Sequence, residues 1–575
     1  MKRREKNQGG CEEAPAKLAD ANGMTCSRDA DGKSGLSKMR VMGVLVACLM
    51  ISSVFFSLSV VLRDPPSDGV PPDERVLELN AKSRRETGSV EGTSHSVMGS
   101  EDKLLGGLLA TGFDEDFCIS RYGSVSYRKA SGHKPSPYLV SRLRAYEALH
   151  KRCGPNTEPY NRAVEYLRSD DGSPKQFMGC KYVVWISFSG LGNRILTLAS
   201  TFLYALLTNR VLLVDPGVDM ADLFCEPFPN ASWFLPLDFP LKDQFHGFDQ
   251  NSGHCYGKML KENSPDVMNK MKQPSFLYLH LVHNYDDQDK LFFCEDEQSF
   301  LKEVPWLIVK SDNYFIPSLF LIPLFEEELN NLFPEIETVF HFLGRYLFHP
   351  TNPVWGLVKR YYHAYLSGFD EKMGIQIRVF DTGTGPFQHV LDQILACTGR
   401  ENLLPSVDRG RSILPNSYSH KSKVVLVTSL SLGYSEHIRD LYWENPTTTG
   451  EVVSVFQPSH EEHQQTEKQM HNQKAWSEMY LLSLMDTLVT SSWSTFGYVA
   501  QGLGGLRPWI LYKPENRTAP DPPCQRAMSM EPCFHAPPFY DCKAKRGIDT
   551  GELVPHVRHC EDMSWGLKLI NPSND

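Results

Sequence analysis

The longest uninterrupted apolar stretch of the chain lies near its start. Residues 41–62 read VMGVLVACLMISSVFFSLSVVL and carry no charged side chain over 22 residues. A helix rises about 1.5 Å per residue, so this segment is long enough to cross the ~30 Å hydrocarbon core of a bilayer. A cleaved signal peptide is the weaker alternative, because its apolar core is shorter and lies nearer the N-terminus. We therefore expect one transmembrane helix over 41–62.

The segments on either side of this helix are polar. Residues 1–40 form a basic tail, and the fifteen residues before the helix hold four Lys or Arg, against two in the fifteen after it. This bias places the N-terminus in the cytosol and the rest of the chain on the far side of the membrane, as in a type II protein. Residues 63–103 are rich in Pro, Ser, Gly and charge and poor in aromatics. Such a stretch buries too little apolar surface to fold alone, so we expect a stem.

Beyond the stem, short β-branched runs alternate with helix-length stretches. A strand at 181–187, a glycine turn, a helix at 195–209 and a strand at 211–215 form one β-α-β unit. Because strands separated by helices predict parallel sheets covered on both faces, we expect an α/β fold of two doubly wound Rossmann-type domains, about 175–365 and 366–515, facing a cleft. Ligands of such folds bind at the carboxyl ends of the strands. The other predicted strands are 374–380, 423–429, 452–456, 486–492 and 508–512, and the other predicted helices are 468–485 and 495–503.

Composition and charge narrow the class of protein. The 575 residues are 41% hydrophobic and 22% charged, which excludes a mostly disordered or multi-span membrane chain. The 59 Lys and Arg against 69 Asp and Glu give a net charge of −10, which disfavours a nucleic-acid partner. Eleven of the 14 cysteines follow the predicted helix, so an oxidising lumen allows at most five disulfides and leaves one thiol over, in pairings that the sequence does not fix. Asn230 and Asn516 lie in N-x-S/T sequons and are predicted glycosylation sites.

A glycine turn at the first strand-to-helix junction suits a phosphate. Gly190-Leu-Gly192-Asn193-Arg194 lets the backbone approach an anion at a helix start, with the Asn193 and Arg194 side chains as further donors. Position 195 is Ile, so the third glycine of the dinucleotide fingerprint is missing. A plain tight turn is the alternative.

Two later junctions carry similar groups. Arg378 follows the alternating segment 374–377 at the carboxyl end of a predicted strand. Its planar guanidinium suits a diphosphate, and a salt bridge at the sheet edge is the alternative. The segment 491–498, SSWSTFGY, follows another strand and opens a helix. Its hydroxyls and N–H groups suit phosphate oxygens and its rings suit a base, whereas a helix cap with core aromatics is the alternative.

Metal-binding patterns are weak. Asp114-Glu-Asp116 and Asp287-Gln-Asp289 are acidic pairs of the kind that hold a nucleotide-bound cation, but such pairs often arise by chance. The four cysteines between 524 and 560 lack the paired spacing of a zinc knuckle. We therefore expect no metal site.

Several long segments resemble the plant fucosyltransferase family. They include SFSGLGNRILTLASTFLYALLTNRVLLVD, GIQIRVF and TSSWSTFGYVAQGLGGLRPWILY, and the resemblance extends over nearly all of residues 104–570 but not over the tail, anchor and stem. It implies a GT-B-like fold, with an acceptor-side catalytic half at 104–365 and, at 366–575, a half that binds the nucleotide sugar and ends in a Cys-rich tail. It also implies GDP-fucose as donor, no cofactor or metal, and a Golgi membrane location with the catalytic part in the lumen.

The same resemblance assigns roles to single residues. Arg378 matches the arginine that contacts the donor diphosphate, and Asp312, in SDNYF, matches an acidic position considered for the catalytic base. The loop DTGTGPF lacks an acidic residue after Asp381 that relatives carry, which implies a change of loop detail. The expected donor-site residues are Gly190, Gly192, Asn193, Arg194, Arg378, Ser492, Ser494, Thr495, Phe496 and Gly497.

The activity that the resemblance implies is transfer of L-fucose from GDP-β-L-fucose to the 2-hydroxyl of galactose side chains of xyloglucan, in cell wall biosynthesis and with inversion at the anomeric carbon. Without a metal, Arg378 and the N–H groups of helix starts have to stabilise the GDP that leaves. Two alternatives stay open: an enzyme for another wall glycan such as arabinogalactan protein, and a non-catalytic glycan-binding relative. A homo-oligomer and a complex with other Golgi glycosyltransferases are also left open.

Overall fold

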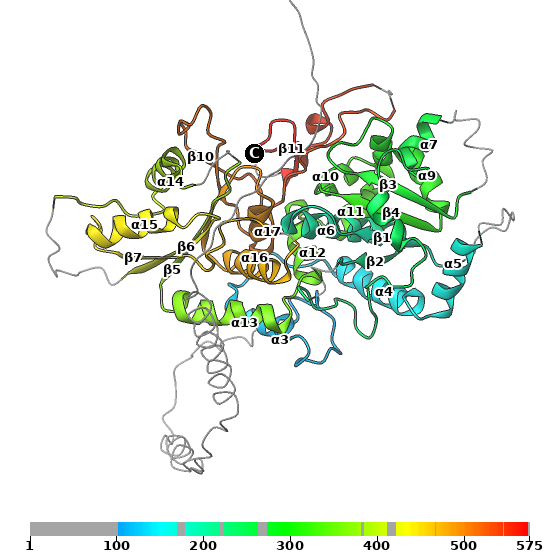
Figure 1. The fold of residues 1–575 in the computed structure, drawn as a ribbon, viewed down its shortest axis with the longest axis horizontal. Coiled ribbons are helices and arrows are strands. Elements are labelled where there is room, and N and C mark those ends of the chain that lie inside the picture. Colours follow the sequence, from blue (N-terminus) through cyan, green and yellow to red (C-terminus); the bar gives the residue numbers. More distant parts are fainter. Residues whose placement is uncertain are drawn as a thin grey trace, which may run out of the picture. The chain divides into compact units, whose positions relative to one another are not determined.

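The computed structural model describes residues 102–169, 179–217, 220, 222–262, 273–380, 385–410, 421–465, 467–543 and 546–572 (Figure 1). The predicted tail and transmembrane helix, and all of the predicted stem except its last two residues, lie outside these ranges. Among the described residues, no helix combines the length and apolar character needed to cross a bilayer. The transmembrane helix at 41–62 therefore stays a prediction.

The first sheet has the order β2-β1-β4-β3, and each neighbouring pair is parallel. Successive residues of a strand point to opposite faces, and here both faces are covered: Val183 and Trp185 of β1 belong to one apolar core, Tyr182 and Val184 to another. The strands are β1 (Tyr182–Ile186), β2 (Val211–Asp215), β3 (Phe276–Leu281) and β4 (Trp306–Ser311). The helices of this half are α3 (Ile119–Gly123), α4 (Pro137–Cys153), α5 (Glu158–Arg168), α6 (Leu191–Thr208), α7 (Tyr256–Glu262), α9 (Glu295–Glu303), α10 (Ile316–Leu319), α11 (Glu326–Leu332), α12 (Val339–Leu347) and α13 (Asn352–Tyr361).

The second sheet has the order β10-β9-β8-β5-β6-β7 and is parallel except for β10, which runs antiparallel to β9. After it, β11 (Val557–His559) and β12 (Leu567–Leu569) form a short antiparallel pair. The strands of the second sheet are β5 (Glu371–Gln376), β6 (Ser422–Thr428), β7 (Val452–Phe456), β8 (Thr487–Ser491), β9 (Trp509–Leu511) and β10 (Cys524–Arg526). The helices of this half are α14 (Gln388–Arg400), α15 (Gly433–Glu444), α16 (Gln469–Leu482) and α17 (Thr495–Gly504).

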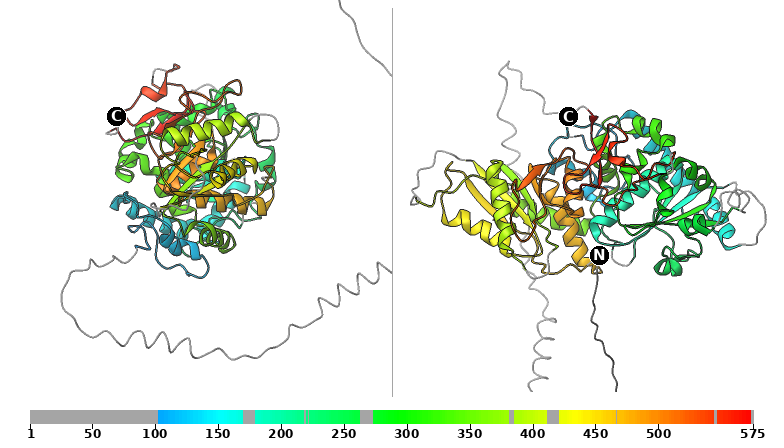
Figure 2. Two further views of the ribbon diagram at one scale, coloured as in Figure 1. Left: turned by 90° about the vertical axis from the view of Figure 1, so that its left-hand side faces the viewer. Right: turned by 90° about the horizontal axis from the view of Figure 1, so that it is seen from above.

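Four helices join the two sheets. In Figure 1 the first sheet lies on the right and the second on the left, and α6, α12, α16 and α17 lie between them; the view from above in Figure 2 keeps the orange helices between the sheets. Helix α17 contacts α6, α12 and α16 directly. Buried side chains fill this contact, among them Trp476 of α16, whose ring lies 5.1 Å from that of Phe224. The starts of α6 and α17 are thereby held close together.

In the first sheet β1 and β4 are the two central strands. In the second sheet the direction of strand succession reverses between β5 and β8. Ligands of open parallel sheets bind outside the carboxyl ends of the strands at such places. The predicted site segments all follow these four strands: 187–194 follows β1, Asp312 follows β4, Arg378 follows β5 and 492–497 follows β8.

Disulfides tie distant parts of the chain together. The bridge Cys294–Cys542 and a 2.6 Å hydrogen bond from the Tyr314 hydroxyl to Glu531 hold the segment after β10 against the first half. Within the described residues, the sequence limit of five bridges and one thiol left over is confirmed, and the free thiol is the buried Cys255. The five bridges are Cys118–Cys225, Cys153–Cys180, Cys294–Cys542, Cys397–Cys524 and Cys533–Cys560.

Two differences from the predicted elements bear on the site. The strand predicted at 374–380 ends at Gln376, so Arg378 lies two residues beyond it rather than inside it. Strands β3 and β4 were not predicted, although both are fully apolar in their first four residues apart from the Tyr278 hydroxyl and are almost wholly buried. Strands β3 and β4 complete the four-stranded first sheet.

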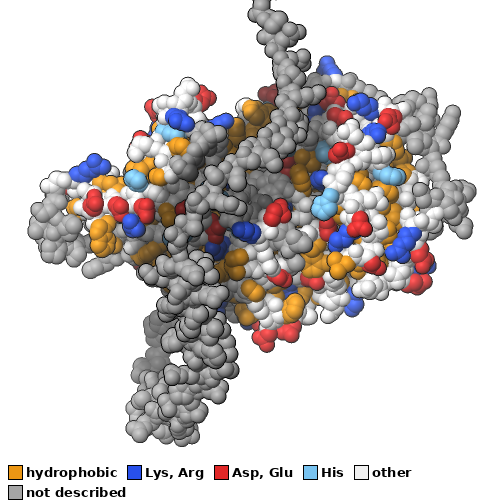
Figure 3. All heavy atoms as spheres, viewed as in Figure 1, with side chains coloured by type: hydrophobic (Ala, Val, Ile, Leu, Met, Phe, Trp, Pro, Cys, Tyr) orange, Lys and Arg blue, Asp and Glu red, His pale blue; other side chains and the backbone are white. Residues whose placement is uncertain are grey.

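The described surface is mixed in charge. On the face shown in Figure 3, Lys and Arg side chains lie among Asp and Glu side chains. Ion pairs of opposite sign occur across the surface, such as Arg142–Glu328 at 2.7 Å and Lys181–Glu303 at 3.2 Å. The described residues on the face shown do not form the one-sided basic stripe that binds a nucleic-acid backbone.

Candidate functional site

A cavity of about 360 Å³ lies at the carboxyl ends of β1, β5, β6 and β8. The turn after β1, the segment after β5 and the segment after β8 contribute to its wall, together with α16 and the loop before it. The predicted residues that line it are Gly190, Gly192, Asn193, Arg378, Ser494, Thr495 and Phe496.

Two helices begin at this cavity with free N–H groups. Helix α6 starts after Gly190 and α17 after Ser494, and neither cap side chain accepts a hydrogen bond from the first turn. The residues just before these caps, Ser189 and Trp493, have φ of 69° and 59°, a left-handed conformation that is rare outside glycine. Strain of this kind persists where the surrounding structure enforces it. Both helix starts therefore present unsatisfied donors and a positive dipole end to the cavity, which suits an anion.

Arg378 supplies a full positive charge beside these donors. Its backbone N–H donates to the Ser491 hydroxyl at 3.0 Å, which ties the ends of β5 and β8, and its guanidinium donates to Gln464 at 3.0 Å. Among the described residues it has no carboxylate partner, and burial lowers its pKa. A half-buried guanidinium without a carboxylate favours an anionic ligand, because the ligand restores the stabilisation lost on leaving water.

Asn193 connects the two halves beside the cavity. Its side-chain N–H donates to the backbone oxygen of Asp312 at 2.8 Å, and its side-chain oxygen accepts from the Thr495 hydroxyl at 2.9 Å. Gly192 lies against the same helix start: a Cβ atom there would be 2.6 Å from the Thr495 hydroxyl oxygen and 3.0 Å from the Phe496 nitrogen. Glycine is therefore the residue that permits this approach of α6 to α17.

Four predicted site residues do not line the cavity. The buried Arg194 donates from Nε to the Ser189 oxygen at 2.7 Å, so it holds the left-handed turn. The Ser492 hydroxyl donates to the Leu511 carbonyl of β9, and Gly497 packs against Thr490 of β8. These three residues support the two helix starts from behind. The fourth, Asp312, lies on the first-sheet side behind Asn193.

The cavity also contains residues that the sequence did not single out. Glu478, on α16, is buried, and its Oε1 has no hydrogen-bond partner among the described residues. Burial raises the pKa of this carboxyl to about 7. Glu461 forms an ion pair with Lys474 at 2.5 Å, and Gln464 contacts Arg378. These residues come from the helix predicted at 468–485 and from the loop before it. In the sequence, a helix face that lines a binding site has the same pattern as an ordinary buried helix face.

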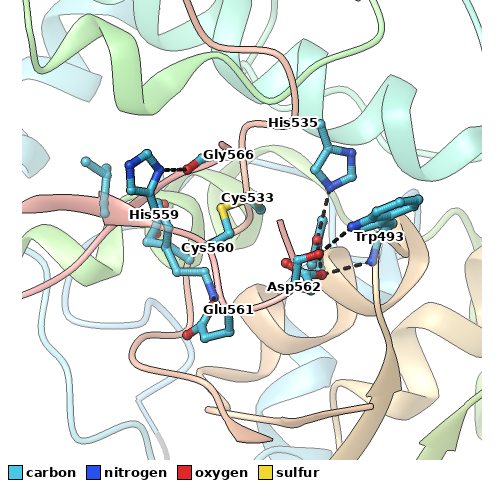
Figure 4. The surroundings of a disulfide bond; sticks show 12 residues. Trp493, Cys533, His535, His559, Cys560, Glu561, Asp562 and Gly566 are labelled. Atoms are coloured by element: carbon cyan, nitrogen blue, oxygen red, sulfur yellow. Dashed lines mark hydrogen bonds and ion pairs between the residues drawn. A yellow bond between two sulfur atoms is a disulfide. The ribbon is translucent and has the colours of Figure 1, made fainter. Parts of the chain in front are cut away.

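Two further cavities open beside Arg378, of about 340 and 480 Å³. The smaller one contains Phe380 and Trp493, whose ring centroids are 6.4 Å apart, and Lys513, whose ammonium lies 4.3 Å from the Trp493 ring. Figure 4 shows Asp562 beside Trp493, where it accepts the Trp493 backbone N–H at 2.9 Å. The site thus combines flat aromatic surface with anion donors, the two features a nucleotide requires.

The carboxylate of Asp312 is surrounded by donors. Its Oδ1 accepts the backbone N–H of His283 and the side-chain N–H of Asn313, both at 2.8 Å, and its Oδ2 pairs with Nδ1 of His283. On the other side of the site, Nε2 of His535 lies 3.0 Å from the Tyr498 hydroxyl, which donates to Asp562 at 2.5 Å. Burial lowers the pKa of His535.

The acidic and cysteine patterns do not converge on this cavity. Asp114 caps its own turn by accepting the Asp116 N–H at 2.9 Å, and Asp287 pairs with Lys290 at 2.9 Å. Cys533, Cys560 and Asp562 lie within ligand distance of one another, but the two sulfurs are bonded to each other and are not thiolates (Figure 4). The described residues therefore offer charge to an anion mainly through Arg378 and backbone N–H groups.

Two mainly parallel sheets, each covered on both faces and with strand carboxyl ends at one cavity, define a GT-B-like α/β fold. The family model for xyloglucan fucosyltransferases matches residues 79–543. The chain belongs to this family.

Named relatives agree over nearly the whole length. Galactoside 2-alpha-L-fucosyltransferase of Pisum sativum is 65% identical over 98% of this chain and 98% of its own. The protein of the same name from Arabidopsis thaliana is 62% identical over 92% of this chain and 93% of its own. A solved structure of a mutant of Arabidopsis thaliana FUT1 in complex with GDP is 66% identical, covers 82% of this chain and 100% of its own, and superposes with a TM-score of 0.77.

Proposed function

We infer that this chain is a fucosyltransferase that moves L-fucose from GDP-β-L-fucose to the 2-hydroxyl of galactose in xyloglucan. One observation carries the chemistry: the guanidinium of Arg378, which has no carboxylate partner among the described residues, lies at a cavity where two helices begin without a side-chain cap. The names of the relatives supply the donor nucleotide and the acceptor sugar.

The reaction needs these groups because of where charge develops. Going from a β-linked nucleotide sugar to an α-linked product inverts the anomeric carbon, through a state in which the sugar resembles an oxocarbenium ion. The bond from the anomeric carbon to the β-phosphate oxygen breaks, and its electron pair stays on GDP. Arg378 and the first N–H groups of α6 and α17 face this growing negative charge and are already oriented, so no reorganisation is needed as it forms.

The most direct test incubates the purified chain with GDP-fucose and galactosylated xyloglucan and determines the linkage of the product. We expect fucose α-linked to O2 of galactose, and the same activity when EDTA is present, because the proposed charge stabilisation uses no metal. Arabinogalactan protein offered at equal galactose concentration serves as the competing acceptor. Fucosylation of that acceptor alone would contradict the acceptor assignment, and loss of activity in EDTA that Mg²⁺ restores would contradict the metal-free mechanism.

Glu478 is proposed to bind the guanine base. Guanine presents two adjacent N–H donors, and a buried carboxylate with an unpartnered oxygen accepts both. Glu478→Gln should weaken GDP binding about tenfold, since hydrogen bonds to a charged group contribute about 1.5–3 kcal/mol. IDP, which lacks the 2-amino group, should be discriminated from GDP by the wild type and much less by the variant.

The same carboxyl predicts a pH dependence. Burial raises the pKa of Glu478 to about 7, so the empty site is increasingly protonated as the pH falls below 7. Guanine favours the ionised form, so GDP affinity should decrease as the pH falls from 8 to 6. The GDP phosphate also titrates in this range, and it does so in wild type and variant alike. Calorimetric titration of Glu478→Gln over the same range therefore measures the contribution of the phosphate, which is subtracted from the wild-type profile. A pH profile of equal steepness in wild type and variant would contradict the assignment.

We propose that the chain is a single-pass type II protein of the Golgi membrane with its catalytic part in the lumen. The apolar segment 41–62 and five disulfides among the described residues support an oxidising compartment beyond one anchor. Asn230 and Asn516 are exposed, so both sequons are open to glycosylation. Protection of the catalytic part from protease in sealed Golgi vesicles supports this topology, and digestion without detergent contradicts it.

A further inference from the structure

The pair formed by His283 and Asp312 has the geometry of an oriented base. His283 lies just after β3 and Asp312 just after β4, so two neighbouring parallel strands deliver both residues to the edge of the sheet that faces the site. An ionised carboxylate only accepts hydrogen bonds, so the contact between Nδ1 of His283 and Oδ2 of Asp312 places the imidazole proton on Nδ1. The other nitrogen, Nε2, then carries a lone pair.

Exposure distinguishes the two side chains. Asp312 is only 10% exposed, and its oxygens already accept three hydrogen bonds from His283 and Asn313. His283 is 67% exposed, and its Nε2 has no hydrogen-bond partner among the described residues. The carboxylate is therefore enclosed and occupied, whereas the imidazole nitrogen is open to a sugar hydroxyl.

The pair lies next to the cavity. The backbone oxygen of Asp312 accepts from Asn193, whose side chain lines the cavity and also contacts Thr495 at the start of α17. Two residues after His283, the Tyr285 hydroxyl donates to the backbone oxygen of Ala536 at 2.5 Å, adjacent to the cavity residue His535. Asp312 is thus held against the wall of the proposed donor site, and His283 pairs with it on the first-sheet side.

We propose that Nε2 of His283 is the general base that takes the proton of the acceptor hydroxyl, and that Asp312 is a positioning residue that acts through it. This proposal rests on the proposed function. In it, Nε2 of His283 accepts the proton in place of the Asp312 carboxylate. As the galactose O2–H bond breaks, its proton goes to Nε2 and its electron pair forms the new bond from O2 to the anomeric carbon of fucose. The bond from that carbon to the β-phosphate oxygen breaks, and GDP leaves with the pair.

Asp312 favours each part of this step. Its carboxylate fixes the tautomer that leaves Nε2 basic, and its negative charge stabilises the imidazolium that forms. The exposure of His283 lets the imidazolium return its proton to solvent after each turnover. His535, the histidine that lines the cavity, is less suited: the Tyr498 hydroxyl donates to Asp562, so Nε2 of His535 has to donate to Tyr498, and burial disfavours its cation.

Replacing His283 by alanine should lower kcat about 10²-fold, which is the lower end of the usual effect of losing a general base. The effect is small because the acceptor oxygen is only weakly bonded in an oxocarbenium-like transition state, so little of its proton has been transferred. The affinity for GDP, measured by calorimetry, should stay within about twofold of the wild type. Added imidazole should restore a substantial part of the activity, since the open position of His283 admits it. His246→Ala, which removes another exposed histidine, is the matched control and should behave as the wild type.

Asp312 is tested by the same rescue. Asp312→Asn should lower kcat, and in the double variant with His283→Ala imidazole should rescue less than in His283→Ala alone. Wild-type kcat in His283→Ala, or a loss that imidazole does not restore, would overturn the proposal; activity that survives His283→Ala but not Asp312→Asn would return the base role to Asp312. If the wild-type chain transfers no fucose to any acceptor, the proposed function fails and the base assignment fails with it.

Discussion

Replacement of Arg378 by alanine is expected to lower kcat by about 10²–10³-fold, the usual cost of removing one preorganised donor to a developing oxyanion. The guanidinium is half-buried and lines the 360 Å³ cavity together with the starts of α6 and α17. Among the described residues it forms no ion pair, so its charge is available to a ligand. The loss should exceed any change in KM for the xyloglucan acceptor, because Arg378 faces the leaving group rather than the acceptor.

Two further variants separate charge from shape. Arg378→Lys keeps the charge but not the planar fork that contacts two phosphate oxygens together, so it should recover only part of the activity. Arg439→Ala removes a 54% exposed arginine that pairs with its neighbour Asp440, and should leave kcat unchanged. Wild-type kcat in Arg378→Ala would refute the assignment of this residue to the diphosphate.

Gly192→Ala should reduce activity by about 10²–10³-fold, although it adds only one methyl group. The new Cβ would be 2.6 Å from the Thr495 hydroxyl oxygen and 2.9 Å from the Thr495 carbonyl carbon. Backbone cannot move aside as a side-chain tip can, so the starts of α6 and α17 have to separate. Displacement of catalytic donors by about 1 Å costs about 10²-fold in rate, and donors on both helices are displaced here.

Stability and activity have to be measured together for this variant. Overpacking typically costs about 1–3 kcal/mol, so Gly192→Ala should remain folded with a lower Tm. Gly399→Ala, within α14, adds a methyl group with no atom within 4 Å, so it should lower neither Tm nor activity. If Gly192→Ala retained wild-type turnover, the close approach of the two helix starts would have no catalytic role.

The sequence predicted the parts of the fold that depend on local pattern. The β1-α6-β2 unit is correct to within a few residues, because its strands are apolar runs and its helix is long and apolar. Strand β4 was missed, although its first four residues are apolar; its last two, Lys310 and Ser311, are polar. The disulfide pairing could not be predicted from the sequence, because Cys294 and Cys542 come together only when the chain is fully packed.

The site was predictable where it follows a strand and not where it depends on side-chain direction. Gly192, Arg378 and Thr495 were identified because a junction between a parallel strand and a helix limits where a residue can lie. Arg194 occupies the same junction, yet its side chain turns back to Ser189, and no local pattern distinguishes it from Asn193. Glu478 and His283 reach the site through helix packing and strand order, which periodicity alone does not supply.

The central claim is that Arg378, with the helix starts around it and without a metal, holds the β-phosphate of GDP. Calorimetric affinities of GDP and GMP in the presence of EDTA test it most directly, because the two ligands differ only in that phosphate. We expect the wild type to bind GDP much more tightly than GMP, and Arg378→Ala to lose most of this difference while its affinity for GMP changes little. An undiminished preference for GDP in Arg378→Ala, or a wild-type preference that vanishes in EDTA, would contradict the account.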